Sequence, residues 1–124
     1  MDKKRILVVD DQKNAREGLT QLLIKEGYEV VAAATGAVAL NMVKKQDFDL
    51  IITDLMMPEV SGLDILGEIA EKKLNIDVII VTAYGEVNSY LKAMTLGAFD
   101  YLNKPIKVKE LHHIINEALN HSYA

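Results

Sequence analysis

Five apolar runs recur along the chain, and each is short enough to be a strand. They cover residues 4–11, 29–34, 50–54, 77–82 and 99–105. The runs at 4–11, 50–54 and 77–82 are apolar at consecutive positions and rich in Ile and Val, which is typical of strands buried on both faces of a sheet. The run at 29–34 is less bulky and is predicted to lie nearer an edge. The run at 99–105 is predicted to be a short fifth strand.

Between and after these runs the apolar residues recur at helical spacing, which predicts five amphipathic helices. The predicted stripes are Ala15, Gly18, Leu19, Leu22 and Leu23; Ala39, Leu40 and Val43; Ile65, Leu66 and Ile69; Val87, Leu91, Met94 and Ala98; and Leu111, Ile114, Ile115, Ala118 and Leu119. The stripe of the first helix is expected to face the core.

Several helix ends carry recognisable signals. Gly27 stands where a left-handed residue would end the first helix. Thr35 is a plausible N-cap for the second helix. Ser61 and Asp64 resemble a capping box for the third.

Strand and helix therefore alternate five times with short connections. That order predicts an α/β fold with a parallel sheet covered by helices on both faces. We expect one doubly wound, flavodoxin-like sheet of five strands in the order 2-1-3-4-5, flanked by five helices. A chain of 124 residues fits a single domain over 1–124.

Composition narrows the classes of function. The formal charge is −4 at pH 7, which argues against direct nucleic-acid binding by this chain. Cysteine is absent, so a thiol nucleophile and a thiolate metal site are excluded. No apolar run approaches the ~20 residues that would span a bilayer, and the basic N-terminus does not resemble a signal peptide. We expect a cytoplasmic protein that does not bind membranes.

Polar residues follow four of the predicted strands. Asp10 and Asp11 end the first, Asp54 the third, Thr82 the fourth and Lys104 the fifth. Because parallel strands bring these ends to one edge, we expect three carboxylates, a hydroxyl and an ammonium to converge there.

Two carboxylates at 4 Å repel by about 4 kcal/mol at an effective dielectric near 20, so either a proton is held or a cation is bound. A hard divalent ion suits oxygen ligands, which makes Mg2+ the expected cofactor, with Mn2+ as an alternative. Since Mg2+ usually takes one or two carboxylates together with phosphate oxygens, this edge is predicted to handle phosphate.

Five segments in order carry a family resemblance. They are Val8-Val9-Asp10-Asp11, Asp54-Leu55-Met56-Met57-Pro58 with Gly62 behind it, Val81-Thr82-Ala83-Tyr84, Gly97 to Leu102, and Lys104-Pro105. Over essentially its whole length the chain resembles the receiver domains of bacterial two-component response regulators. The resemblance implies a signalling phosphoacceptor that catalyses only its own phosphorylation and dephosphorylation.

The resemblance also implies a role for each acidic residue. Asp54 would be the phosphorylation site. Asp11 and Asp54 would ligate Mg2+ directly, with the backbone carbonyl of Met56 as a third protein ligand. Asp10 would act through metal-bound water.

The remaining roles concern the phosphoryl group and a conformational switch. Lys104 would pair with one phosphoryl oxygen and Thr82 would hydrogen-bond another. Tyr101 would turn inward as Thr82 moves; the alternative is ordinary packing of a tyrosine on a strand. The Lys104–Pro105 peptide would be cis, a form that few X–Pro bonds adopt.

The expected phosphodonor is a histidine kinase or a phosphotransfer protein. Phosphorylation would change the surface formed by the fourth helix, fifth strand and fifth helix, with a phosphorylation-dependent homodimer as one outcome. The segments around Thr82 and Tyr101 resemble receivers of AAA+ transcriptional activators, so the chain is predicted to be the N-terminal regulatory domain of a transcriptional regulator. The alternative is a stand-alone receiver that relays phosphate or acts by protein contact.

Two functions from other classes are less well supported. A Mg2+-dependent aspartyl phosphatase would need a second acid two residues after Asp54, where Met56 stands. A flavin-binding module would need a phosphate-cradling loop after the first strand, where Asp10 and Asp11 would repel phosphate. Because Met56 cannot orient an attacking water and Tyr84 is bulky, the phosphorylated form is predicted to hydrolyse slowly.

Overall fold

The structure is a computed structural model that describes residues 3–83 and 85–121. Ten elements alternate along the chain, as the sequence pattern predicts. They are β1 (Arg5–Val9), α1 (Lys13–Lys25), β2 (Glu29–Ala33), α2 (Gly36–Lys45), β3 (Leu50–Asp54), α3 (Gly62–Glu71), β4 (Asp77–Thr82), α4 (Val87–Thr95), β5 (Asp100–Asn103) and α5 (Val108–Asn120).

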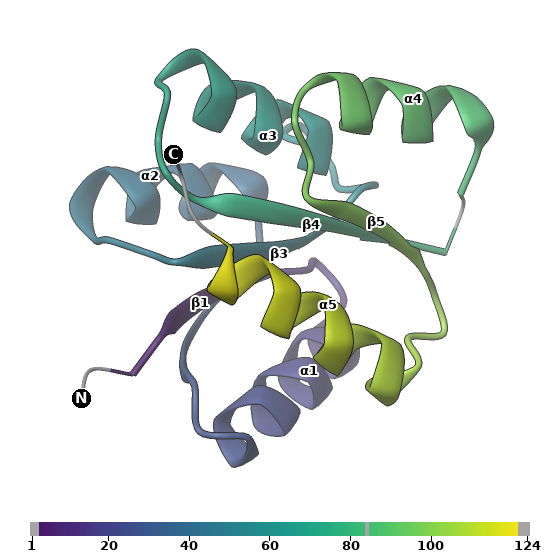
Figure 1. Cartoon of the computed structure of the whole chain (residues 1–124). Helices are drawn as coiled ribbons and strands as arrows, with labels where there is room; N and C mark the ends of the chain where they lie inside the picture. Colours follow the sequence, from purple (N-terminus) through teal and green to yellow (C-terminus); the bar gives the residue numbers. More distant parts are fainter. Residues whose placement is uncertain (1–2, 84, 122–124) are drawn as a thin grey trace.

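The five strands form one parallel sheet in the order β2-β1-β3-β4-β5. This confirms the predicted fold class and strand order, with β2 at an edge. Helices α2, α3 and α4 cover one face of the sheet, and α1 and α5 cover the other (Figure 1). The β1 strand ends at Val9 rather than at the acids, so Asp10 and Asp11 lie in the loop that follows it.

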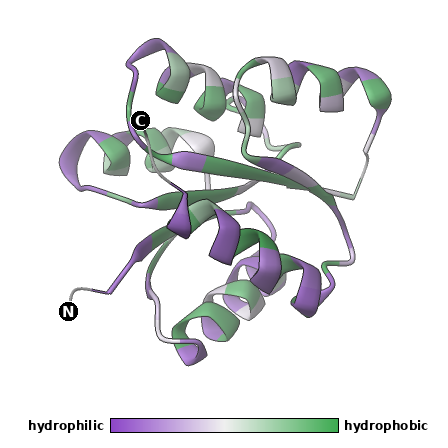
Figure 2. Ribbon diagram, in the orientation of Figure 1, coloured by the Kyte–Doolittle hydropathy of each residue, from purple (hydrophilic) through white to green (hydrophobic). Residues whose placement is uncertain are grey.

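Alternate strand residues supply two separate cores. Leu7 and Ile51 pack toward α2, α3 and α4, whereas Ile6 and Ile52 pack toward α1 and α5. The strands are hydrophobic in the centre of the molecule, and the helices carry their polar residues outward (Figure 2). Burial of both strand faces holds the carboxyl edge of the sheet in a fixed place.

The predicted helix signals are present. Thr35 accepts a hydrogen bond from the Val38 amide at 3.1 Å. The side chains of Ser61 and Asp64 each accept a bond from the other's backbone amide, which forms a capping box at the start of α3. Gly27 has a φ of 99° and donates its amide to the carbonyl of Ile24, so it ends α1 in the left-handed region.

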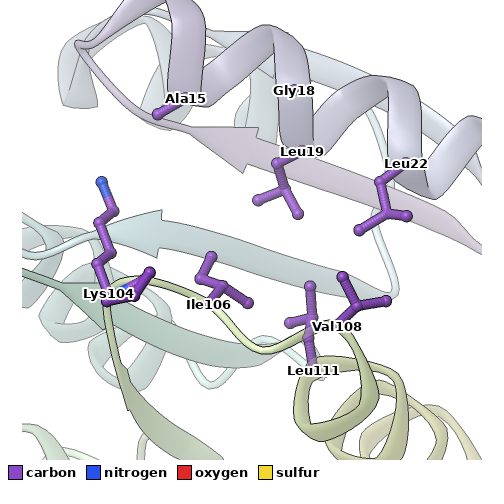
Figure 3. A pocket seen from close by; sticks show the side chains of 9 residues that line it. Ala15, Gly18, Leu19, Leu22, Lys104, Ile106, Val108 and Leu111 are labelled. Atoms are coloured by element: carbon purple, nitrogen blue, oxygen red, sulfur yellow. The ribbon is translucent and has the colours of Figure 1, made fainter.

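The predicted core stripe of α1 is wrong in part. Leu23 is buried, but Ala15 and Gly18 are exposed. The exposed Ala15 and Gly18 line an apolar groove of about 250 Å³ between α1 and α5, beside Lys104 (Figure 3). Leu19 and Val108 also line this groove. The helical spacing predicts the helix correctly, but α1 turns only part of its stripe inward and leaves the rest beside α5.

The apolar residues of α4 also lie differently from a core stripe. Val87 is 74% exposed, Leu91 54% and Met94 37%, whereas Ala93 is buried. Ala98, predicted to belong to this stripe, is buried but lies beyond the end of the helix at Thr95. The helix therefore contacts the sheet through the small Ala93 and presents its large apolar side chains to solvent. Among the described residues, no helix has the length and apolarity needed to cross a membrane.

Candidate functional site

Three carboxylates meet at the carboxyl ends of β1 and β3. These strands are neighbours, with Val9 paired to Thr53, so the residues that follow Val9 lie next to Asp54. One carboxylate oxygen from each of Asp10, Asp11 and Asp54 lies within 4.8 Å of the other two. The convergence predicted from the strand ends is therefore present for these three acids.

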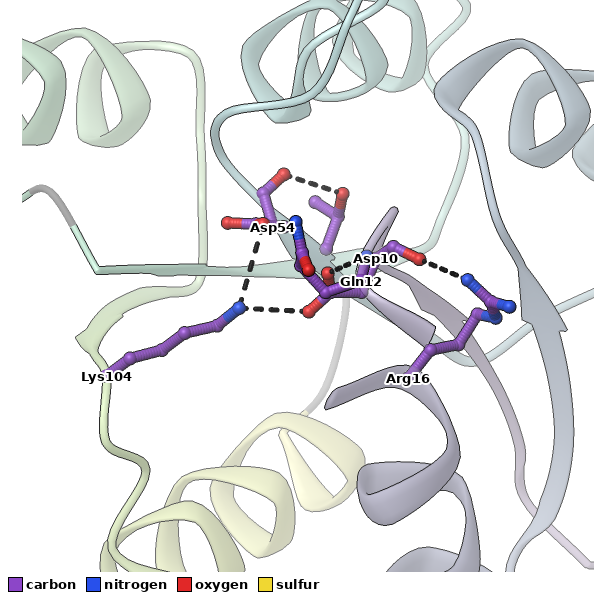
Figure 4. Close-up of polar contacts among 6 residues, drawn as sticks. Asp10, Gln12, Arg16, Asp54 and Lys104 are labelled. Atoms are coloured by element: carbon purple, nitrogen blue, oxygen red, sulfur yellow. Dashed lines mark hydrogen bonds and ion pairs between the residues drawn. The ribbon is translucent and has the colours of Figure 1, made fainter. Parts of the chain in front are cut away.

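Lys104 reaches the same place from the loop after β5. Its Nζ lies 3.0 Å from a carboxylate oxygen of Asp10 and 3.6 Å from one of Asp54 (Figure 4). The Lys104–Pro105 peptide is cis, as the resemblance implied. A single ammonium thus bridges two of the three carboxylates.

The charges of the site are not balanced. Burial raises the pKa of Asp54; Lys104 works against that shift, whereas Asp10 adds to it. For Lys104 burial disfavours the ammonium, but the hydrogen bond and charge of Asp10, followed by the charge of Asp54, outweigh it and raise the pKa. The fold therefore favours the charged form of Lys104 and disfavours the ionised form of Asp54.

The backbone around Asp54 is tightly supported. The Thr53 hydroxyl donates to the carbonyl of Asp54 at 3.0 Å, and the Leu55 amide donates to the carbonyl of Val81 at 3.0 Å. A Cβ at Gly62 would overlap the Asp54 carbonyl oxygen, so only glycine permits α3 to begin this close to the strand. These contacts hold the backbone of Asp54 in place at the end of β3.

Asp10 has two further partners that the strand-end pattern does not include. The Gln12 amide donates to its Oδ1 at 2.9 Å, and the Arg16 guanidinium donates to its backbone carbonyl at 2.9 Å (Figure 4). Arg16 lies in α1 rather than at a strand end, so the pattern of strand ends does not include it. Its spacing from Asp10 (one helical turn beyond Gln12) is the signal that could have identified it.

Thr82 and Tyr101 lie on the neighbouring strands. Thr82 ends β4 and is fully buried, and its backbone carbonyl accepts the Lys104 amide at 2.8 Å. Tyr101 is paired with Ile80 on β4 and is half-buried. Its hydroxyl lies 2.7 Å from the hydroxyl of Ser89 in α4.

Met56 and Tyr84 are the two residues predicted to affect hydrolysis of the phosphorylated form. Met56 follows Asp54 by two residues and is 59% exposed. Tyr84 lies outside the described residues.

His112 and His113 are neighbours in α5 but contact different acids. His112 lies 2.9 Å from Glu26, and His113 lies 2.8 Å from Glu117.

The acidic cluster fits a hard divalent cation. Its three carboxylates face one ammonium, and their oxygens are close enough to share one ion. A small cavity of about 30 Å³ borders Asp10, Asp54 and Lys104. The donor set contains only oxygen, as Mg2+ prefers.

Comparisons with known proteins agree with this geometry. Residues 6–116 match the family model described as the response regulator receiver domain. The chain is 37% identical to sporulation initiation phosphotransferase F of Bacillus subtilis, over 96% of this chain and 96% of that protein. It is also 37% identical to the regulatory protein AtoC of Escherichia coli, over 93% of this chain but only 25% of AtoC. Among solved structures, response regulator protein TrrA of Thermotoga maritima in complex with Mg(2+)-BeF aligns with a TM-score of 0.85 at 40% identity, over 94% of this chain and 99% of TrrA.

Proposed function

This chain belongs to the response regulator receiver domain family, and from that premise we propose that Asp54 is a phosphoacceptor that takes a phosphoryl group from a histidine kinase or phosphotransfer protein. The observation that carries the proposal is the buried Asp54 carboxylate beside two further acids and Lys104, at the carboxyl edge of a doubly wound sheet.

The proposed reaction is a simple displacement at phosphorus. A carboxylate oxygen of Asp54 attacks the phosphorus of a phosphohistidine, the P–N bond breaks, and the imidazole nitrogen keeps the electron pair. The product is an acyl phosphate on Asp54. Because the protein mainly positions groups in such transfers, the support of the Asp54 backbone by Thr53, Leu55 and Gly62 serves this step.

Lys104 and Thr82 are the proposed phosphoryl partners. The Lys104 Nζ already lies 3.6 Å from the Asp54 carboxylate, so an oxygen of the attached phosphoryl group would come within its reach. Thr82 ends the adjacent strand, and its hydroxyl would donate to a second oxygen. The two groups would offset the charge that the phosphoryl group brings, about −1.5 to −2 at neutral pH.

Mg2+ is the proposed cofactor, and Mn2+ would serve in its place. Asp11, Asp54 and the Met56 carbonyl would hold it directly, and Asp10 would act through a water molecule. When bound, the ion would neutralise the acidic cluster and the incoming phosphate oxygens. Lys104 alone cannot offset three carboxylates.

The proposed output is a change in the surface formed by α4, β5 and α5, including a phosphorylation-dependent homodimer. The chain corresponds to a quarter of AtoC but to nearly all of phosphotransferase F. We favour the role of an N-terminal regulatory domain of a cytoplasmic transcriptional regulator, with a stand-alone receiver as the alternative.

The apolar groove beside Lys104 offers the phosphodonor a surface next to the site.

Phosphorylation by phosphoramidate, with and without Mg2+, tests the proposal. The parent should gain phosphate only with Mg2+, and Asp11→Asn should react roughly tenfold more slowly or worse, because it removes a metal ligand. Asp47→Asn is the matched control, since Asp47 is exposed and precedes β3 at the opposite edge of the sheet. Equal rates for Asp11→Asn and the parent would contradict the assigned metal site.

A further inference from the structure

The hydroxyl of Ser89 holds together two parts of the fold. Ser89 lies in the first turn of α4, and its Oγ donates to the backbone carbonyl of Glu86 at 3.0 Å. The same oxygen accepts the Glu86 amide at 3.4 Å. The second bond is one half of the capping box at the start of α4, in which Glu86 is the N-cap residue and Ser89 the N3 residue.

The third partner of Ser89 is the phenol of Tyr101, at 2.7 Å. Because the Ser89 proton points to the Glu86 carbonyl, the arrangement that satisfies all groups has Tyr101 donating to Ser89. The Tyr101 ring also meets the ring of Tyr90 edge to face, with centroids 5.5 Å apart. Ser89 and Tyr90, both in the first turn of α4, thus hold Tyr101 outward against this helix.

The β4–α4 loop packs closely against this contact. A Cβ at Gly85 would collide with the Asn103 side chain and approach the Tyr101 ring. Gly85, Glu86 and Tyr101 line a common groove of about 300 Å³. The start of α4 and Tyr101 therefore share one local environment. The N-cap residue of α4, Glu86, follows Thr82 by four residues.

We propose that Ser89 is a positioning residue, a latch that ties the outward position of Tyr101 to the folding of the first turn of α4. An inward turn of Tyr101 toward Thr82 breaks the bond to Ser89, and the start of α4 then loosens. The latch itself stands on the contacts above; its release by phosphorylation rests on the proposed function.

A double-mutant cycle read by amide hydrogen exchange tests the latch. The reporter is the Tyr90 amide, which donates to the Glu86 carbonyl at 3.0 Å. Loss of one hydrogen bond, worth about 1 kcal/mol net, corresponds to roughly fivefold faster exchange. Tyr101→Phe should show this acceleration in the parent but none in the Ser89→Ala background. Ser89→Thr, which keeps the hydroxyl, should restore the effect of Tyr101→Phe.

The matched control is the capping box of α3. Ser61→Ala should speed exchange at the Ile65 amide, which donates to the Ser61 carbonyl at 3.1 Å, and Tyr101→Phe should not alter that result. An equal acceleration by Tyr101→Phe with and without Ser89 would overturn the latch. So would a Tyr90 amide that does not respond to Tyr101→Phe at all.

Release is tested with Mg2+ and beryllofluoride as the phosphate analogue. Exchange at the Tyr90 amide should rise about fivefold in the parent and should not rise further in Tyr101→Phe. If beryllofluoride binds at Asp54 and the Tyr90 amide stays protected, release is wrong and the phosphoacceptor role stands. If beryllofluoride does not bind, the proposed function and the release both fail, and the double-mutant cycle still decides the latch.

Discussion

Asp54 is held in a site that does not favour its ionised form. The residue is 9% exposed, and one of its carboxylate oxygens lies within 4.8 Å of oxygens of Asp10 and Asp11. The ammonium of Lys104 lies closer to Asp10 than to Asp54. Burial is the largest contribution to its raised pKa. A disfavoured charge of this kind fits the proposed role of Asp54 as a nucleophile whose charge a bound cation would offset.

This arrangement predicts that Asp54→Asn stabilises the metal-free protein at neutral pH. A raised folded pKa means that ionised Asp54 costs stability above that pKa, so removing the charge should raise the Tm at pH 7.5 by roughly 4 °C, for about 1 kcal/mol in a domain of this size. The gain should shrink as the pH falls through the raised pKa and vanish towards the ordinary value of 3.8. Thermal unfolding in chelator across this range measures it.

Asp47→Asn is the control for that experiment, because Asp47 is exposed. It should leave the Tm unchanged at every pH. A Tm for Asp54→Asn at or below that of the parent at pH 7.5 would show that the pair with Lys104 outweighs burial and repulsion.

The residue at position 56 is expected to influence how long a phosphoryl group stays on Asp54. Its exposed side chain stands two residues after Asp54 and has no group that can orient a water molecule. Met56→Asn should therefore speed hydrolysis of the acyl phosphate several-fold, whereas Met56→Leu should not. Decay of the phosphoprotein after removal of the phosphodonor measures the rate, and equal decay in both variants would count against the hypothesis.

At the scale of elements, strand ends were predictable because the residue after a buried strand is placed by the sheet. Asp54 and Lys104 follow from the strand pattern, and the parallel order brings them together. Helix faces were less predictable. The spacing of Val87, Leu91 and Met94 marks α4 correctly, but only packing decides that the small Ala93 faces the sheet.

Because Thr82 lies between the site and α4, its substitution should affect the response of α4 to phosphorylation more than phosphorylation itself. Thr82→Ala should keep phosphorylation of Asp54 within about twofold of the parent, because Lys104 and the proposed metal ligands remain. The substitution nevertheless removes a hydroxyl donor worth about 1 kcal/mol. The response of α4 and β5 to phosphorylation, followed by NMR chemical shifts, should therefore weaken.

Thr35→Ala is the matched control, since it also removes one threonine hydroxyl, the one that caps α2. It should lose stability without losing the response of α4. A full response in phosphorylated Thr82→Ala would show that the signal bypasses this hydroxyl.

For the whole molecule, alternating elements and short connections were enough to predict the sheet order, because right-handed crossovers leave few topologies. Contacts between a helix side chain and a distant strand were not predictable in this way. The contact of Ser89 with the Tyr101 hydroxyl depends on how α4 lies over the sheet, which no local spacing encodes.

The proposed phosphorylation of Asp54 can be measured by the intact mass of the protein after incubation with phosphoramidate and Mg2+. The parent should gain a single phosphoryl group, and Asp54→Ala should gain none. A parent that stays unmodified, or an Asp54→Ala variant that still takes up one phosphoryl group, would show that Asp54 is not the phosphoacceptor.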